Sequence, residues 1–340
     1  MSRYAAIFAN PQGPGDTRPT ALQIVEDEGV VGKLLGKTAL ITGANQGIGL
    51  ETARALHATG ITLYITARDT TKGNQAVESI KGGPGPKSDA PIHVLELQLD
   101  SFESVQNAAN AFLSDTSKVN ILILNAGVMA TPEGRTKDGF ETQFGTNHLG
   151  HFLLLQMLTP ALLAACTPEF QSRVVLLSSA GHRAGGVRFH DLNFEKEAYD
   201  PWLAYGQSKT ANIYLANEVE RRYGGQGLHG LSVHPGLIPT NLGSHLPAES
   251  LKFTEEMMKD LKSIPQGAAT TIVAAISKEW EGRGGKYLRD CTEDSPEDPG
   301  VHWSLSDRGY ASWAFNESAA VELWETSLNL ISSQQHYHKF

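Results

Sequence analysis

Short apolar runs alternate with longer segments of helical period along most of this chain. Six runs, rich in β-branched residues and bounded by Gly, Asn or Ser, fit buried parallel strands. They cover residues 38–42, 61–66, 92–99, 120–125, 173–179 and 228–234. Segments such as 48–59 and 101–114 fit the helices that connect them. The alternation predicts an α/β fold with a doubly wound parallel sheet and helices on both faces, and its ligand should bind beyond the carboxyl ends of the strands.

The pattern divides the chain into an extension, one domain and a tail. Residues 1–36 form an N-terminal extension with a short predicted helix from Thr20, residues 37–330 form a single domain, and residues 331–340 form a tail. After the sixth run, residues 237–264 contain Pro239, Pro247 and an amphipathic stretch, 251–261, and Pro265 follows directly. A long insertion after a late strand predicts a helical lid over the substrate.

Composition and charge exclude several classes of partner. The 28 Lys and Arg against 37 Asp and Glu give a net charge of −9, without a basic block for nucleic acid or an anionic membrane. The two cysteines, Cys166 and Cys291, lie far apart, so we expect neither a disulfide nor a metal site. The longest apolar run, 151–166, is too short to span a bilayer. We expect a cytoplasmic protein without a membrane span.

A glycine-rich segment follows the first predicted strand and opens the first predicted helix. It reads Gly43-Ala44-Asn45-Gln46-Gly47-Ile48-Gly49. Glycines permit a tight turn and let the backbone approach a diphosphate, whose charge is favoured by the free N–H groups and dipole at a helix start. This placement predicts a dinucleotide site, with an ordinary glycine-rich turn as the alternative.

The second predicted strand ends at Ala67-Arg68-Asp69, which bears on the choice of dinucleotide. An acidic residue at this distance from the glycines binds the ribose 2′-OH of NAD, whereas an arginine binds the 2′-phosphate of NADP. Arg68 therefore favours NADP(H) as the cofactor. The alternatives are NAD bound through Asp69 and a surface pair between Arg68 and Asp69.

Tyr205 and Lys209 lie four residues apart in a segment of helical period. Positions i and i+4 share a helix face, so the phenol and the ammonium are expected in one pocket. A free tyrosine has a pKa of about 10, and lowering it by about three units needs roughly 4 kcal/mol. A unit charge about 4 Å away at an effective dielectric of about 20 supplies an energy of that order. We therefore expect Lys209, helped by an oxidised nicotinamide, to make Tyr205 an acid and base near neutrality.

Further motifs accompany this pair. In order, TGANQGIG, LNAG, Asn147, the serine pair 178–179, YGQSK and HPG resemble the motif set of the short-chain dehydrogenase/reductases over residues 37–240. NHLGHFLL, HDLNF, QGAATT, GGKYLRDC and LWETS are similar to the branch that contains retinol dehydrogenases and WW-domain oxidoreductases, and they extend the resemblance to nearly the whole chain. The resemblance implies a single Rossmann-like sheet.

The resemblance also implies catalytic roles for four residues. Tyr205 would exchange a proton with the substrate oxygen, and Lys209 would lower its pKa and bind the nicotinamide ribose. Ser179 would hydrogen-bond the same oxygen and stabilise a developing alkoxide. Asn147 would hold a water that connects Lys209 to solvent.

The cofactor is expected to lie along the same edge of the sheet, with Asn125 and Gly127 on the adenosine side and Pro235, Gly236 and Thr240 against the nicotinamide. Where related sequences carry Leu-Asp-Leu and contact adenine with the Asp, this chain has Gln98, which can still form a hydrogen bond. The implied cofactor-binding residues are Gly43, Asn45, Gln46, Gly47, Ile48, Gly49, Arg68, Gln98, Leu99, Asn125, Ala126, Gly127, Tyr205, Lys209, Pro235, Gly236 and Thr240.

Together these features predict an NADP(H)-dependent oxidoreductase that interconverts a carbonyl and an alcohol by hydride transfer. Apolar residues in the lid favour a lipophilic, even polycyclic, small molecule. Two alternatives stay open: an NADP-binding regulatory or scaffold protein with little turnover, and an epimerase or dehydratase. The oligomeric state also stays open, a homo-oligomer included. For His148, His151 and His182, which lie near the catalytic segments, a structural role is preferred to one in substrate positioning or proton transfer.

Overall fold

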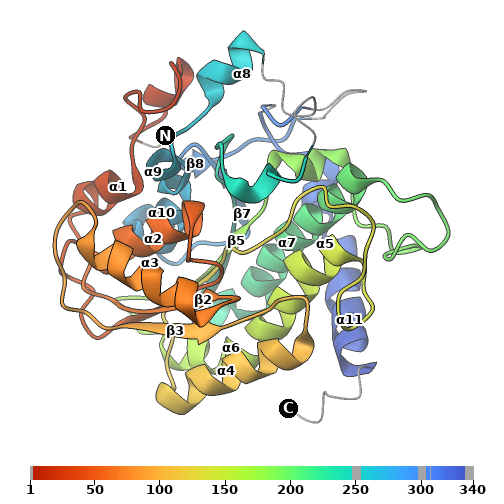
Figure 1. The fold of residues 1–340 in the computed structure, drawn as a ribbon, viewed down its shortest axis with the longest axis horizontal. Coiled ribbons are helices and arrows are strands. Elements are labelled where there is room, and N and C mark those ends of the chain that lie inside the picture. Colours follow the sequence, from red (N-terminus) through yellow and green to blue (C-terminus); the bar gives the residue numbers. More distant parts are fainter. Residues whose placement is uncertain (1–2, 247–253, 298–303, 307, 334–340) are drawn as a thin grey trace.

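One eight-stranded sheet organises the computed structural model, which describes residues 3–246, 254–297, 304–306 and 308–333. The strand order is β3-β2-β1-β4-β5-β6-β7-β8 (Figure 1). All neighbouring strands are parallel except the last pair, in which β8 runs antiparallel to β7. The strands are β1 Thr38–Ile41, β2 Thr62–Ala67, β3 Ile92–Glu96, β4 Ile121–Leu124, β5 Ser172–Leu177, β6 Leu228–His234, β7 Lys286–Arg289 and β8 Thr292–Glu293.

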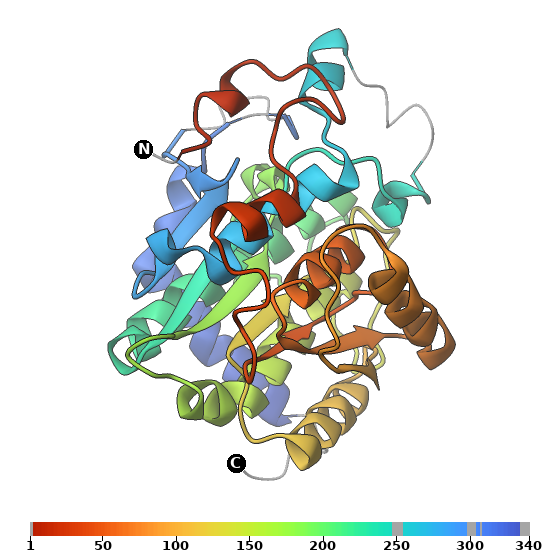
Figure 2. The same cartoon turned by 90° about the vertical axis from the view of Figure 1, so that its left-hand side faces the viewer.

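Helices cover both faces of the sheet, which confirms the doubly wound α/β fold. Residues of α4, α6, α7 and α11 form the core on one face, and residues of α1, α2, α3 and α10 form it on the other (Figures 1 and 2). A π-helical segment, Gly145–Leu149, lies between α5 and α6. The helices are α1 Ala21–Asp27, α2 Gly47–His57, α3 Thr70–Gly82, α4 Phe102–Asp115, α5 Thr142–Phe144, α6 Gly150–Ala164, α7 Pro201–Tyr223, α8 Glu255–Asp260, α9 Ile264–Gly267, α10 Ala269–Ile276 and α11 Glu317–Ser333.

The central strands carry apolar side chains toward both faces of the sheet because both faces are buried. In β1, Leu40 belongs to the core beneath α4 and α6, while Ala39 and Ile41 belong to the opposite core with α2 and α10. β4 alternates in the same way, with Leu122 on one side and Ile121 on the other. Successive side chains of a strand point to opposite faces, so continuous apolar runs are what a doubly covered sheet requires.

The strand order reverses direction between β1 and β4, which are neighbours in the sheet. At such a switch point the loops that follow the two strands diverge and leave a crevice beyond their carboxyl ends. The glycine-rich turn follows β1 and Asn125 follows β4. Ser178 and Ser179 follow β5, and Pro235 follows β6. The fold therefore brings the predicted motifs to one edge of the sheet.

The six predicted strands are all present, although β3 is shorter than its predicted run and ends at Glu96. β7 and β8 were not predicted and extend the sheet beyond β6. The predicted helix at the start of the chain is α1, whose first turn is capped by the Thr20 side chain accepting from the Gln23 N–H. Tyr4, Phe8 and the α1 residue Ile24 join the core of α2 and α10, so the N-terminal extension packs against the domain.

The lid segment, residues 237–264, contains a short 3₁₀ turn, Asn241–Gly243, and the helix α8. Part of it, with the predicted lid residues Leu251 and Phe253, lies outside the described residues, as does most of the predicted tail. No helix of the described part of the chain is long and apolar enough to cross a membrane.

Candidate active site

The glycine-rich turn after β1 has the conformation that its glycines permit. Gly43 and Gly47 have φ angles of +66° and +58°, in the left-handed region that other residues rarely adopt. A Cβ on Gly49 would lie 2.5 Å from both the Gly43 carbonyl oxygen and the Asn125 amide nitrogen, so the turn is packed to the limit. No side chain caps the α2 N-terminus at Gln46, so the first N–H groups of this helix face the crevice without a side-chain acceptor.

Tyr205 and Lys209 lie on one face of α7, as predicted from their spacing. Asp200 caps this helix by accepting from the N–H groups of Trp202 and Leu203, and Pro201 occupies its first turn. The Lys209 Nζ lies 5.5 Å from the centre of the Tyr205 ring and donates to the Leu177 carbonyl at 3.1 Å. Both side chains are buried at the carboxyl end of β5.

Ser178 and Ser179, which follow β5, form different contacts. Ser178 Oγ donates to the Lys209 carbonyl at 2.8 Å and so ties α7 to the sheet. Ser179 shares a hydrogen bond with the Tyr205 hydroxyl, and its Oγ also accepts from the Gly181 N–H at 3.0 Å. Gly181 has to be a glycine, since a Cβ there would lie 2.6 Å from the Tyr205 ring. Ser179 and Tyr205 therefore present two hydroxyls to one point.

Burial dominates the protonation of the tyrosine and the lysine. Burial raises the pKa of Tyr205 to about 12, and the hydrogen bond with Ser179 lowers it only in part. Burial also lowers the pKa of Lys209 to about 8. Desolvation of the phenolate acts against the lowering of the pKa that we expect from Lys209 together with an oxidised nicotinamide, and that combined effect stays a prediction. At neutral pH the structure holds Tyr205 as a protonated phenol.

Asn147 lies in the π-helical segment ahead of α6, and its side chain is completely buried. Its amide Nδ2 donates to the Val128 carbonyl and to Ser208 Oγ, both at 2.9 Å, while its Oδ1 accepts from the Val128 N–H at 2.8 Å. The Ser208 hydroxyl in turn donates to the Tyr205 carbonyl at 2.8 Å. Asn147 therefore couples the loop after β4 to the turn of α7 that carries Tyr205.

A histidine continues this network to the glycine-rich turn. Thr42 Oγ1 accepts from the N–H groups of Asn125 at 2.9 Å and Ala126 at 3.0 Å, so its own proton is directed to His151 Nε2, 2.9 Å away. His151 therefore carries its proton on Nδ1, which donates to the Asn147 carbonyl at 3.0 Å. Burial lowers the pKa of His151 to about 3, so the ring is neutral.

The end of β2 presents Arg68 to solvent beside the crevice. The Asp69 side chain caps α3 by accepting from the Thr71 N–H at 2.7 Å, and no ion pair joins it to Arg68 within the described ranges. A surface pair between Arg68 and Asp69 is therefore not what the structure shows. The Gln98 side chain, predicted to contact adenine, is already engaged, because its Oε1 accepts a hydrogen bond from Lys137 Nζ at 2.7 Å.

The segment after β6 closes the other side of the crevice. Gly236 has a φ of +103°, and Thr240 caps the following 3₁₀ turn by accepting from the Leu242 N–H. Asn241 reaches the glycine-rich turn, where its amide donates to Gln46 Oε1 at 3.3 Å. The lid segment is thus fastened to the predicted dinucleotide site.

An apolar pocket of about 530 Å³ has Trp202 in its lining, and Trp202 packs against Tyr205, which does not itself line the pocket. The Trp202 ring stands edge-on to the Tyr205 ring, with 6.1 Å between their centres, and forms one wall of the pocket. A volume of this size is typical of small-molecule sites. The lining residues are Ala184, Asp200, Trp202, Leu203, Met257, Ser304 and Leu305.

Comparison with known proteins agrees with this arrangement. The family model for short chain dehydrogenases matches residues 37–250, the part of the chain that carries β1 to β6 and the predicted catalytic residues. The chain belongs to the short-chain dehydrogenase/reductase family. This family membership confirms the resemblance seen in the sequence and makes the chain an oxidoreductase by family.

Individual members of the short-chain dehydrogenase/reductase family resemble the chain over most of its length. Short-chain dehydrogenase/reductase prx1 of Penicillium roqueforti is 48% identical and aligns with 97% of this chain and 95% of its own. Mouse retinol dehydrogenase 12 is 38% identical, over 88% of this chain and 87% of its own, which supports the predicted branch. The structure of Pseudomonas aeruginosa RhlG in an NADP active-site complex has the same fold, with a TM-score of 0.59 and 21% identity over 76% of this chain and 96% of its own.

Sequence reasoning did not assign site roles to Thr42, Ser208 or Lys262. Thr42 and Ser208 stand inside the motifs TGANQGIG and YGQSK, so a polar residue within each motif was the available signal. Lys262 contacts the Pro235 carbonyl from a distant part of the chain, and no local pattern marks it. Among the residues that the structure describes, no cluster of His, Cys, Asp and Glu could hold a metal ion.

Proposed function

We propose that this protein is an NADP(H)-dependent oxidoreductase that interconverts a carbonyl and an alcohol on a lipophilic small molecule. The observation that carries the proposal is the pair of hydroxyls of Tyr205 and Ser179, buried beside Lys209 at the carboxyl edge of the sheet. Carbonyl reduction needs a proton donor at the oxygen while hydride reaches the carbon, and a protonated phenol in a dry site is such a donor.

The crevice fits a dinucleotide. The α2 N-terminus is free of a side-chain cap, and the tight turn of Gly43, Gly47 and Gly49 brings backbone N–H groups to its mouth. These are the groups that favour a diphosphate. The nicotinamide cofactor supplies or accepts the hydride when it is bound. Asn125, Pro235 and Thr240 occupy the neighbouring loops that would line its path.

The residues of the site carry out proton donation, charge stabilisation and positioning. In reduction, the Tyr205 hydroxyl donates its proton to the substrate oxygen, while the Ser179 hydroxyl donates a hydrogen bond that stabilises the developing negative charge. Lys209 supplies a positive charge near the phenol and restores its proton. Asn147 keeps the turn of α7 in register with the loop after β4 through Ser208 and Val128. Oxidation of the alcohol runs through the same groups in reverse.

The walls of the pocket support a lipophilic substrate, and an assay tests this directly. Trp202, Leu203 and Met257 offer apolar surface next to Tyr205. The name of the retinol dehydrogenase relative points to a lipophilic alcohol. We expect NADPH to be consumed with cyclic and polycyclic ketones or long-chain aldehydes at a kcat/KM at least about 100-fold above that for small keto acids. Efficient turnover of small charged acids alone would contradict the substrate class. Tight cofactor binding without turnover of any carbonyl or alcohol would favour the scaffold alternative.

Arg68 is the proposed determinant of the NADP(H) preference. Its side chain is exposed at the end of β2, and neither Asp69 nor another described carboxylate pairs with it. We expect Arg68→Ala to raise the dissociation constant of NADPH by about 30-fold and that of NADH by less than about threefold, since only NADPH carries the 2′-phosphate. Fluorescence titration of both dinucleotides measures the two constants. An exposed arginine elsewhere, Arg135→Ala, is the control, and equal weakening of both dinucleotides would refute the assignment.

A further inference from the structure

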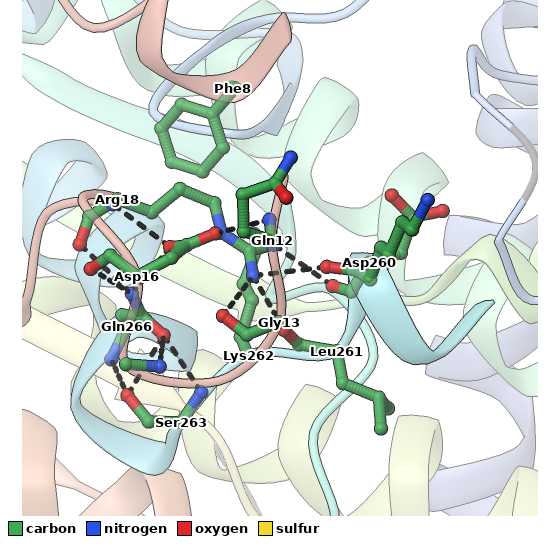
Figure 3. Close-up of polar contacts among 12 residues, drawn as sticks. Phe8, Gln12, Gly13, Asp16, Arg18, Asp260, Leu261, Lys262, Ser263 and Gln266 are labelled. Atoms are coloured by element: carbon green, nitrogen blue, oxygen red, sulfur yellow. Dashed lines mark hydrogen bonds and ion pairs between the residues drawn. The ribbon is translucent and has the colours of Figure 1, made fainter. Parts of the chain in front are cut away.

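In the N-terminal arm, residues 3–20, the buried Arg18 forms hydrogen bonds with the C-terminal end of the lid helix α8 (Figure 3). The Arg18 guanidinium donates to the carbonyls of Asp260 at 3.0 Å, Leu261 at 2.6 Å and Lys259 at 3.3 Å. Its Nη2 also donates to the Gly13 carbonyl at 3.0 Å, within the arm. These lid carbonyls belong to the last turn of α8 and the residue that follows, where a helix leaves its acceptors unsatisfied. Arg18 therefore acts as a C-terminal cap of α8 supplied from about 240 residues away in sequence.

An ion pair and hydrogen bonds fix the position of the Arg18 side chain and of the arm around it. Its side chain is only 2% exposed, and Nε forms an ion pair with Asp16 at 2.8 Å. Gln266 fixes the same stretch of the arm, because its side chain accepts from the Gly15 N–H and donates to the Arg18 carbonyl. The Gly13 N–H donates to the Lys259 carbonyl at 2.9 Å. Arm and lid thus form a polar unit whose geometry is fixed from both sides.

Lys262, the residue after these lid carbonyls, contacts the turn at Pro235 and Gly236 in the predicted cofactor site. The Lys262 ammonium donates to the Pro235 carbonyl at 3.1 Å and to Asp290 at 2.7 Å. Its side chain lies directly on Gly236, where a Cβ would approach Lys262 Cε to 2.8 Å. The backbone at Pro235 and Gly236 is the turn predicted to face the nicotinamide. Lys262 therefore connects the end of α8 with that turn.

A strained hairpin presents the acidic partner of this lysine. Asp290 and Cys291 are the two residues between β7 and β8, and both have positive φ angles, +51° and +60°. Two-residue hairpins with this backbone normally use Asn or Gly, so Asp290 and Cys291 are strained at these positions. Burial alone would raise the pKa of Asp290, but the Lys262 and Arg289 cations lower it to about 2. The turn keeps a charged carboxylate aimed at Lys262.

The contacts of Arg18 with α8 also bear on the proposed substrate pocket, because α8 lines it. Met257, in the middle of α8, forms one wall of the pocket opposite the α7 residues Trp202 and Leu203. Six residues form this helix, which is too short to hold its place by its own hydrogen bonds. The position of the Met257 wall is therefore set by what fastens the ends of α8.

We propose that Arg18 is a positioning residue which, with Lys262, holds α8 and the Pro235–Gly236 turn in the geometry that binds substrate. The proposal rests on the proposed function, because it assigns the held wall to a substrate pocket. It gives the N-terminal arm a role in substrate affinity, although no residue of the arm is placed among the reacting groups. When α8 is already ordered in the free enzyme, substrate binding does not have to supply the free energy for ordering it.

Arg18→Gln is the test, with Arg3→Gln as the matched control. Arg3 lies in the same arm but donates to Asp27 and Glu28 and stacks over the Tyr4 ring, away from the lid. For Arg18→Gln we expect the KM of the carbonyl substrate to rise about tenfold while kcat changes by less than about threefold, because substrate binding must now order the lid. Backbone N–H groups of residues 255–262 should exchange with deuterium about tenfold faster. Arg18→Lys, which keeps the charge but not the fork of donors, should fall between the two.

The outcomes separate this inference from the proposed function. The far-ultraviolet circular dichroism of Arg18→Gln should match that of the wild type, which shows that the variant is folded. Unchanged KM together with unchanged exchange of residues 255–262 would overturn the inference while carbonyl reduction still stands. So would an equal rise in KM for Arg3→Gln, or a loss of kcat with KM unchanged. If the wild type turned over no carbonyl, the proposed function would fail, and the exchange rates alone would decide whether Arg18 holds α8.

Discussion

Tyr205→Phe is expected to reduce kcat for carbonyl reduction by about 10³-fold and to leave the dissociation constant of NADPH within about threefold. The substitution removes one oxygen, so the ring keeps its edge-on packing against Trp202 while the proton donor is lost. Ser179 retains a hydroxyl near the substrate oxygen, but it cannot replace the proton that the phenol delivers. The loss should therefore appear in kcat rather than in KM.

The measurement is single-turnover reduction of a lipophilic ketone at saturating NADPH, with Tyr214→Phe as the control. Tyr214 lies nine residues further along the same helix, is buried as well, and donates its hydroxyl proton to the Trp313 carbonyl at 2.8 Å. Losing that hydrogen bond should cost stability of about 1 kcal/mol but little activity. A Tyr205→Phe protein with full activity would remove the proposed chemistry altogether.

The fold was largely predictable because its strands are buried on both faces. Runs such as Ile121–Leu124 stay apolar at every position, which is a strong local signal. β7 and β8 lack this signal, since Lys286–Arg289 begins and ends with a charged residue and Thr292–Glu293 has only two residues. β7 takes its place at the edge of the sheet by pairing with β6, and β8 by pairing with β7, contacts that no local pattern encodes.

The candidate site was predictable to the extent that it depends on spacing. The i, i+4 rule placed Tyr205 and Lys209 on one face of α7, and strand ends placed Asn125 and Ser179 at the same edge. The protonation of Tyr205 was not predictable, because the desolvation that raises its pKa depends on how completely the surrounding chain buries the ring. The role inferred for Arg18 was hidden for a similar reason. Its partners at residues 259–261 come close only in the folded chain.

Acid should destabilise this protein steeply, because burial keeps several histidines in their neutral form. One of them is His234, whose pKa burial lowers well below its ordinary value. Burial lowers the pKa of His148 and His151 to about 3 and that of His182 to about 4, all below the ordinary value of 6.5. His182 Nε2 accepts from the Ala311 N–H and its Nδ1 donates to the Ser179 carbonyl, so a second proton on the ring would face another donor. The unfolded chain binds these protons below pH 6.5 while the folded chain does not. The free energy of unfolding should therefore fall by about 1.4 kcal/mol per pH unit for each histidine as the pH drops from 6.5 to about 4.

Three such residues together would remove about 6 kcal/mol by pH 5, a large part of the stability of an ordinary domain. Urea denaturation at pH values between 7 and 5 measures the slope, and His148→Phe isolates one contribution. The His148 ring lies between Phe144 and Phe152, at 5.1 and 5.9 Å, so a phenyl ring suits the site although the bond to Ser327 is lost. This variant should be less stable at pH 7, yet its stability should fall by about 1.4 kcal/mol less per pH unit between pH 6 and 5. A His148→Phe protein with the wild-type slope would show that His148 does not stay neutral in the folded state.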